Sequence, residues 1–168
     1  EDSIQISLFA RSLRVYYPGF DVLADDGSPV SDVDACLVLR YLEAPGPVIA
    51  VGEDITFRAL PGGVFYHAAL AKRTTNLLVS IFGNDLERLK RALAQYPHEP
   101  APVGDAGGIV HAIGAITITV IYRAGDEEFG PTADLLYDRF IGRVYTADEV
   151  AALSTSLCVG LARVGHGC

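Results

Sequence analysis

The N-terminal part of the chain alternates between hydrophobic and polar residues, which is the two-residue period of a half-buried β-strand. The pattern extends over residues 3–24, with breaks at Pro18 and Gly19 and again at residues 25–27. Breaks of this kind between alternating runs predict two or three antiparallel strands joined by turns. The hydrophobic positions that define the runs are Ile4, Ile6, Leu8, Leu13, Val15 and Tyr17.

Other segments have apolar residues spaced three and four apart, the period of an amphipathic helix. Three of these segments begin with a capping pair, in which a Ser, Asn or Thr precedes an acidic residue by three positions. The pairs are Ser31 with Asp34, Asn84 with Glu87, and Thr146 with Glu149. The predicted helices span residues 32–43, 64–82, 85–96 and 133–140, and a last helix runs from Thr146 to about residue 162.

Further strands are predicted at residues 54–60, 109–113 and 116–123, and Tyr145 is predicted to close a short one. There are therefore more predicted strands than a regular strand–helix–strand alternation would accommodate. The sequence predicts an α+β fold with mainly antiparallel sheet, packed with three to five helices. A chain of 168 residues suits one domain with a substantial core, so residues 1–168 are expected to form a single domain.

The composition is apolar, with 50% hydrophobic residues, 20% charged residues and a mean hydropathy of +0.29. This argues against disorder. The most apolar segment, residues 107–122, is interrupted by His111, Thr117 and Thr119, so it does not supply the ~20 apolar residues that a membrane helix needs. The composition instead suggests a large core, a partner surface such as an oligomer face, or an apolar ligand pocket.

The net charge of −8 disfavours a nucleic-acid partner or an anionic membrane surface, because 13 basic residues face 21 acidic ones. The three cysteines, Cys36, Cys158 and Cys168, form no CxxC spacing and predict no disulfide framework, which favours a cytoplasmic protein. The chain contains no Met, so we expect it to be processed, trimmed or partly recorded.

Two blocks carry the most distinctive residues. In the first, residues 54–73, paired glycines precede a predicted helix N-terminus, which favours either an anion site or a plain strand-to-helix turn. The second, residues 125–138, contains adjacent acids that can act as an acid/base pair if they are buried. The alternative for this block is a solvated loop with one acid capping a helix near Thr132. The paired glycines are not a Walker loop, since no Gly-Lys-Ser/Thr follows them. Nucleophilic catalysis lacks support, because the chain has no GxSxG or HExxH motif and no Cys with a nearby His in a recognised context.

Histidine and cysteine offer only isolated metal ligands. His67 follows two aromatic residues and suits an axial metal ligand, although an ordinary surface or core histidine is the default interpretation. His166 and Cys168 can supply half of a metal site, which needs two further ligands from elsewhere.

Together the two blocks, DITFRALPGGVFYHAALAKR and GDEEFGPTADLLYD, resemble a bacterial and archaeal family known as domain of unknown function 3786, over nearly the whole chain. That family has no assigned activity. Phe65 and Tyr66 match its aromatic pair, whereas His67 stands where another aromatic is more usual. The resemblance implies an additional helical segment before this chain. It also implies a role related to corrinoids or other tetrapyrroles such as haem, since some members are fused to an iron–sulfur domain.

The leading hypothesis is a small binding or accessory domain rather than an enzyme. The first alternative is an enzyme that uses Glu127 and Glu128 on a small polar substrate, and the second is a protein-interaction or oligomerisation module. We predict that the two blocks lie close together, with Arg58 or Arg73 pairing one acid; the alternative is that each block merely makes its own turn. The candidate ligand-binding residues are Arg58, Gly62, Gly63, Phe65, Tyr66, His67, Arg73, Glu127 and Glu128.

Overall fold

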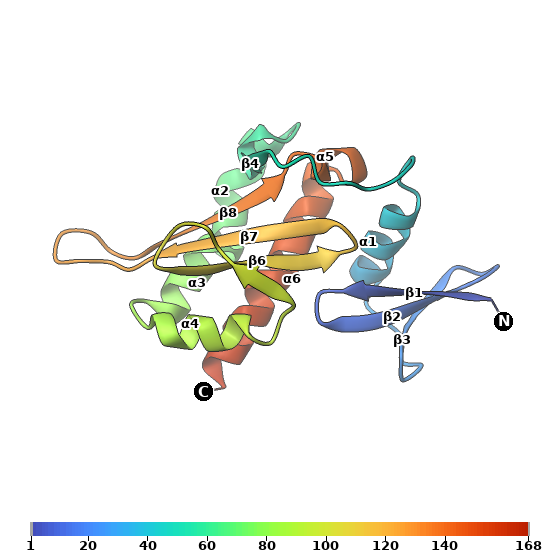
Figure 1. Cartoon of the computed structure of the whole chain (residues 1–168), viewed down its shortest axis with the longest axis horizontal. Helices are drawn as coiled ribbons and strands as arrows, with labels where there is room; N and C mark the ends of the chain where they lie inside the picture. The colour runs from blue at the N-terminus through green and yellow to red at the C-terminus, as the bar shows by residue number, and fades with distance from the viewer. Residues whose placement is uncertain (1, 168) are drawn as a thin grey trace.

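The computed structural model describes residues 2–167 and contains one eight-stranded antiparallel sheet with helices packed against it, which confirms the predicted α+β class (Figure 1). The strands are β1 (Ser3–Leu8), β2 (Arg11–Tyr16), β3 (Asp21–Ala24), β4 (Asp54–Thr56), β5 (His98–Pro100), β6 (Ala106–Ile113), β7 (Ile116–Arg123) and β8 (Thr132–Asp138). The helices are α1 (Asp32–Leu42), the 3-10 helix η1 (Phe57–Ala59), α2 (Gly63–Arg73), α3 (Thr75–Phe82), α4 (Leu86–Leu93), α5 (Ile141–Val144) and α6 (Ala147–His166).

The sheet has a continuous part and a projecting part. The strand order is β3-β2-β1-β6-β7-β8-β4, and β5 also pairs with β6. Strands β6, β7 and β8 pair along most of their length, whereas β1 and β6 share the single residue pair Leu8–Ile113. Strands β1 to β3 therefore extend away from the rest of the sheet, on the side of the molecule where the N-terminus is marked in Figure 1.

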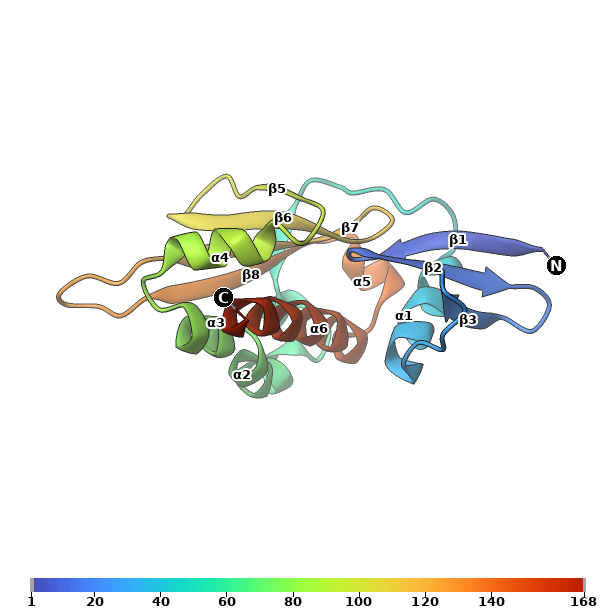
Figure 2. The same ribbon diagram turned by 90° about the horizontal axis from the view of Figure 1, so that it is seen from below.

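Helix α6 lies at the centre of the helical layer. Figure 2 shows α2, α3 and α6 on the same side of strands β6 to β8. Leu153, Leu157 and Leu161 of α6 are completely buried, as are Ile118 and Val120 of β7. Burial of large aliphatic side chains is the main stabilising contribution to such a layer. The capping pair predicted at Thr146 and Glu149 is confirmed at the start of this helix, and the Ser31 cap of α1 is confirmed as well.

Two predicted helices differ in the structure. Residues 64–82 form two helices, because Thr74 has φ −127° and ψ −96° and its hydroxyl donates to the Leu70 carbonyl oxygen. The apolar spacing continues across this break, so the pattern does not reveal it. At the next helix the N-terminal cap is Asp85, whose carboxylate accepts from the Arg88 amide, and not Asn84 as the sequence predicted.

The segment 133–140, predicted as a helix, is mostly strand β8, and this prediction was wrong. Leu135 and Tyr137 are buried on one face of β8, which pairs with β7 on one side and with β4 on the other. The apolar spacing of this segment fits both the period of a helix and the two-residue period of a strand. Pairing on both edges decides in favour of the strand. Tyr145, predicted in a strand, instead ends α5 and donates its hydroxyl proton to the Leu37 carbonyl.

The predicted strand 54–60 is also shorter than expected. Only Asp54–Thr56 pair with β8, and the chain then turns into η1. No helix within residues 2–167 is long and apolar enough to cross a membrane.

Candidate functional site

The acidic block forms the loop of the β7–β8 hairpin. The Asp126 carboxylate accepts hydrogen bonds from the amides of Glu128 and Phe129, each at 2.8 Å. Both bonds lower the pKa of Asp126, and the bond from the Phe129 amide has the larger effect. A carboxylate that accepts from the amides two and three residues ahead shapes a turn. Asp126 therefore has a structural role in the conformation of the loop.

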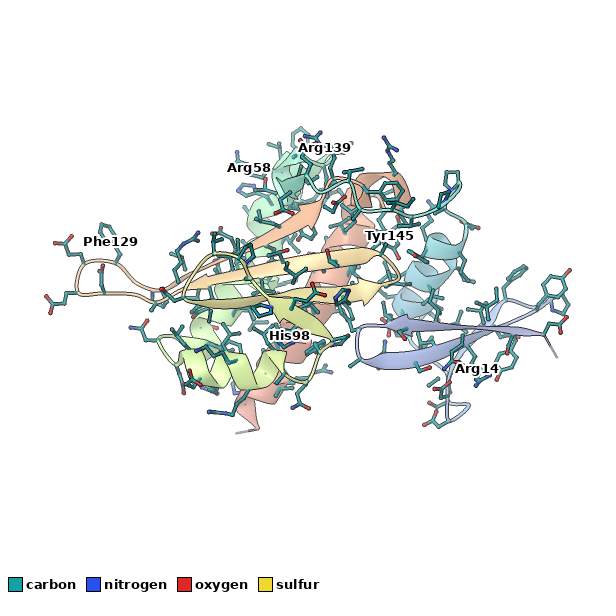
Figure 3. The ribbon with its side chains drawn as sticks, in the orientation of Figure 1. Arg14, Arg58, His98, Phe129, Arg139 and Tyr145 are labelled. Carbon is teal, nitrogen blue, oxygen red and sulfur yellow. The ribbon has the colours of Figure 1, made fainter. Side chains whose placement is uncertain are left out.

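Asn84 fastens the base of this hairpin loop. Its side-chain oxygen accepts from the Gly125 amide at 2.8 Å, and its side-chain nitrogen donates to the Gly125 carbonyl at 3.2 Å. A Cβ atom at Gly125 would lie 2.6 Å from the Pro131 nitrogen, so the loop closes too tightly for any other residue there. Figure 3 shows Phe129 far out on this projecting hairpin, and its side chain is 71% exposed.

Glu127 and Glu128 are exposed on the hairpin loop, and within the described part of the chain their carboxylates have no ion-pair partner. They do not line the groove described below. An acid/base pair with a raised pKa needs burial or a close like charge in a cleft. The geometry therefore argues against the hypothesis of an enzyme that uses these two acids.

The glycine-containing block makes a turn between η1 and α2. Gly62 has φ +81°, in the left-handed region, and a Cβ atom at Gly63 would collide with the Phe57 carbonyl. These two requirements explain the paired glycines as a strand-to-helix turn. Phe65 is 87% exposed on α2, and the His67 ring nitrogen Nδ1 lies 3.3 Å from the Val64 carbonyl oxygen.

The two blocks do not lie together, so the prediction of a shared site was wrong. The first block follows β4, which pairs with the end of β8 that is distant from the hairpin loop. Figure 3 shows Arg58 near α2 and Phe129 well apart from it. Neither Arg58 nor Arg73 forms an ion pair with Glu127 or Glu128 in the described structure. Strand β8, predicted as a helix, is what separates the blocks.

Two of the candidate residues, Tyr66 and Arg73, instead line a groove of about 940 Å³ on the face of α6 that points away from its buried leucines. We call this the α6 groove. Helix α2 forms one wall. Three segments form the other wall: the β1–β2 turn, the start of α1, and the residues after α4. The floor consists of small α6 side chains, namely Ala151, Ala152, Thr155, Ser156, Val159 and Gly160.

The floor of the α6 groove contains a polar atom that is buried without a partner. Thr155 Oγ1 is inaccessible to solvent and has no hydrogen-bond partner among residues 2–167. By contrast, the neighbouring Ser154 hydroxyl donates to the Val150 carbonyl and lies 2.7 Å from the Tyr137 hydroxyl. Buried polar atoms without a partner are rare and costly, so Thr155 Oγ1 is a donor and acceptor that the described residues leave unsatisfied directly under the groove floor.

Tyr96 closes the groove on the side opposite α2. Its ring packs edge-to-face on Phe9 at 6.0 Å between centroids, and its hydroxyl lies against Gly160, where a Cβ atom would collide with it. Burial, as the largest cause, raises the pKa of Tyr96. The phenol therefore stays protonated near neutral pH and can donate a hydrogen bond into the groove.

The groove is locally basic in an acidic chain. It is lined by three of the 13 basic residues but only two of the 21 acidic ones, Asp34 and Asp148. Arg11 is paired with Asp34 at 2.7 Å. Arg73 and Arg163 are exposed and form no ion pair with any residue that the structure describes. Such a bias favours an anionic ligand.

Metal binding gains no support from the described residues. Residues 2–167 contain no group of three His, Cys, Asp or Glu side chains that could hold a metal ion. His67 is absent from the lining of the α6 groove. His166 ends α6, and Cys168 lies outside the described residues.

Sequence reasoning missed Thr155, Arg163 and Tyr96. A signal was present, because α6 combines buried leucines on one side with small residues at positions 152, 156 and 160 on another. A helix face of small residues is typical of a surface that another group approaches closely. It does not by itself indicate which group.

The fold and the groove define an α+β domain in which an antiparallel sheet is covered by helices and the central helix is partly open to solvent. Residues 1–159 match the family described as domain of unknown function 3786, and the chain belongs to this family. This confirms the resemblance of the two blocks. No curated protein and no solved structure matches the chain.

Proposed function

We propose that the chain is a ligand-binding domain that holds an anionic, partly apolar small molecule in the α6 groove. The observation that carries this proposal is the Thr155 hydroxyl, which has no partner among residues 2–167, in a groove whose lining also includes Arg73 and Arg163, two cations without an ion pair in the same range. The volume of about 940 Å³ is within the range of small-molecule sites. Small floor residues allow a flat molecule to lie directly on the backbone of α6.

Each polar group has a distinct role in this proposal. The arginines attract an anionic group and bind it with charge-assisted hydrogen bonds. The Thr155 hydroxyl, which is covered in the free chain, bonds a polar atom of the ligand body once a small shift of the floor side chains exposes it. The aromatic side chains of Tyr66 and Tyr96 cover the apolar part of the ligand. None of these roles requires bond-making chemistry, so a binding domain accounts for the site more simply than an enzyme does.

A tetrapyrrole is one ligand of this class, and the family resemblance favours a corrinoid or haem. The groove suits the periphery of such a molecule, because Arg73 and Arg163 can bind the propionates of a haem, or the phosphate and amide oxygens of a cobalamin. Among residues 2–167, no His or Cys lines the groove, so this part of the chain does not supply it with the usual nitrogen or sulfur ligand to a central metal. The α6 groove therefore suits a flat anionic molecule, but it does not offer the usual axial ligand to a central metal.

Titrations with three probes test the proposal. Anilinonaphthalene sulfonate reports an apolar anionic site by fluorescence, and haemin and hydroxocobalamin report tetrapyrrole binding by their absorbance bands. We expect saturable binding of at least one probe. Arg163→Gln is expected to weaken it about tenfold or more, since a hydrogen bond to a charged group contributes about 1.5–3 kcal/mol.

The matched control is Arg91→Gln, which removes another exposed arginine, on α4, that does not line the groove. This variant is expected to bind like the unaltered protein. Equal weakening by both substitutions would indicate nonspecific attraction to positive charge. Saturable binding that neither Arg163→Gln nor Arg73→Gln alters would contradict a site in the groove, and binding of the sulfonate alone would exclude the tetrapyrroles.

A further inference from the structure

Among the described residues 2–167, the outer edge of β1 is unpaired over most of its length. Strand β2 pairs with one side of β1 from Ser3 to Leu8, but on the other side β6 meets only Leu8. The hairpin β1–β2 projects past the ends of β6 and β7, as Figures 1 and 2 both show. Strand edges of this kind are templates for pairing with another strand.

The hydrogen-bonding groups on this edge follow from the register. The Tyr17 amide donates to the Asp2 carbonyl at 2.9 Å, so the even-numbered residues of β1 direct their backbone groups toward β2. The odd-numbered residues direct their backbone amides and carbonyls away from β2. Phe9 follows this rule, because its amide donates to the Ala112 carbonyl of β6. Ser3 and Gln5 therefore present amides and carbonyls that no other described strand pairs with.

This edge lacks the devices that usually prevent association. Residues 3–7 read SIQIS, with no charged residue and no proline. The opposite edge differs, because β3 begins with Asp21 and its Leu23 forms a bridge with Pro29. Lys, Pro and inward charges are the common protections of exposed edges, and β1 has none of them.

An apolar surface lies directly beside the open edge. Ile4 is 56% exposed, although its face of β1 is the one that points toward α1. With Tyr17, Phe20 and Leu42 it lines a mainly apolar cavity of about 630 Å³ between the hairpin and the end of α1. All four side chains remain exposed in the single chain. A partner on the β1 edge covers them as well as the backbone groups.

We propose that a second copy of this chain pairs antiparallel with β1 across a two-fold axis at Ile4. The end of β6 occupies the place beside Leu8, so the open edge is centred near Ile4. In this register Ser3 forms two hydrogen bonds with Gln5 of the second copy, and Gln5 forms two with Ser3 of that copy. The two Ile4 residues face each other at a non-hydrogen-bonded position, where side chains approach most closely.

The second copy is favoured over an unrelated strand because the edge is complementary to itself. The two-fold register places residues with outward-directed backbone groups opposite each other, and it places Ile4 opposite Ile4 of the second copy. It creates no like-charge contact along the strand. Both copies of α1 then lie on the same face of one continuous sheet. The apolar surfaces around Leu42 and Tyr17 become neighbours, which is the isologous arrangement of a two-fold dimer.

Sedimentation equilibrium tests the dimer. The unaltered protein is expected to associate reversibly into a dimer by about 100 μM, consistent with a small interface. Ile4→Lys places two cations opposite each other at the axis and is expected to weaken association at least about tenfold. The control Ile49→Lys alters another exposed isoleucine, 62% accessible, away from the edge and is expected to associate normally.

Cross-linking tests the register independently. In a background with Cys36→Ser and Cys168→Ser, Ile4→Cys is expected to form an intermolecular disulfide under mild oxidation, since self-opposed residues in a non-hydrogen-bonded pair lie within disulfide reach. Gln5→Cys, which opposes Ser3 and not itself, is expected to cross-link far less. A protein that stays monomeric at every concentration overturns the proposal. A dimer that persists in Ile4→Lys, without the Ile4→Cys cross-link, overturns it too.

Discussion

The β7–β8 hairpin loop and the floor of the α6 groove are both polar, but they differ in how their polar atoms are satisfied. In the loop, the Asp126 carboxylate and the Asn84 amide bond to backbone groups of the loop itself. In the groove, Thr155 Oγ1 has no partner among the described residues, and Arg163 forms no ion pair there. A conspicuous motif is thus explained by local folding, whereas an ordinary helix face carries the features of a binding site.

The largest expected effect concerns a turn residue outside both regions, and it tests the view that glycine motifs here are structural. Gly63→Ala is expected to reduce the free energy of unfolding by about 2–4 kcal/mol, because the new Cβ collides with the Phe57 carbonyl. Gly62→Ala is the control and should cost about 1 kcal/mol, since its positive φ is strained but its surroundings are open. Urea denaturation measures both. Equal losses would contradict the steric explanation.

Thr155→Val separates stability from binding in the groove. Removing a buried hydroxyl that lacks a partner is expected to raise the free energy of unfolding by about 1 kcal/mol, while binding of the fluorescent or absorbing probe weakens. Ser154→Ala is the contrasting variant: its hydroxyl is bonded, so the protein should lose about 1 kcal/mol. A stability loss in Thr155→Val would show that the hydroxyl has an internal partner.

A smaller effect is expected from Asp126 in the hairpin. Its pKa is lowered in the folded chain, so its contribution to stability is present above the unfolded value near 3.8 and is lost as the pH falls through the folded value. Thermal unfolding of Asp126→Asn should therefore differ from the unaltered protein by a constant amount at pH values well above 3.8 and converge with it only as the pH falls below the lowered pKa of the folded chain. A difference that stays constant over the whole pH range would contradict a role for the ionised carboxylate.

The smallest effect is expected from Glu127 and Glu128. Replacing both with Gln should change the free energy of unfolding by less than about 0.5 kcal/mol and leave probe binding unchanged, because both side chains are exposed. The same titration and denaturation experiments measure this. Weakened binding with unchanged stability would restore the hairpin loop as part of a site.

Local signals in the sequence were sufficient for much of the fold. The strands in residues 3–24 and the caps at Ser31 and Thr146 were predicted correctly, since each depends on neighbouring residues alone. Strand β8 was not, because its pairing with β4 and β7 is supplied by residues far away in the chain. The break at Thr74 was missed because α2 and α3 continue one apolar pattern.

The candidate site was predicted only in part, for a related reason. Tyr66 and Arg73 line the groove, and they were chosen for their place in a recognisable block. Thr155, Arg163 and Tyr96 come from segments with no motif, and only tertiary packing brings them to one surface. A buried hydroxyl without a partner is a property of the folded chain, so no sequence pattern could have indicated it.

The single residue pair between β1 and β6 has a consequence for the cooperativity of unfolding. Within residues 2–167, strands β1 to β3 pair with the remaining sheet only through Leu8 and Ile113, so these strands are expected to open before β6 to β8 and to exchange their amide hydrogens faster. Phe9, next to that joint, also lines the α6 groove. An occupied groove would therefore slow amide exchange in a hairpin that lies mostly outside it, because the β1–β2 turn is part of the groove wall.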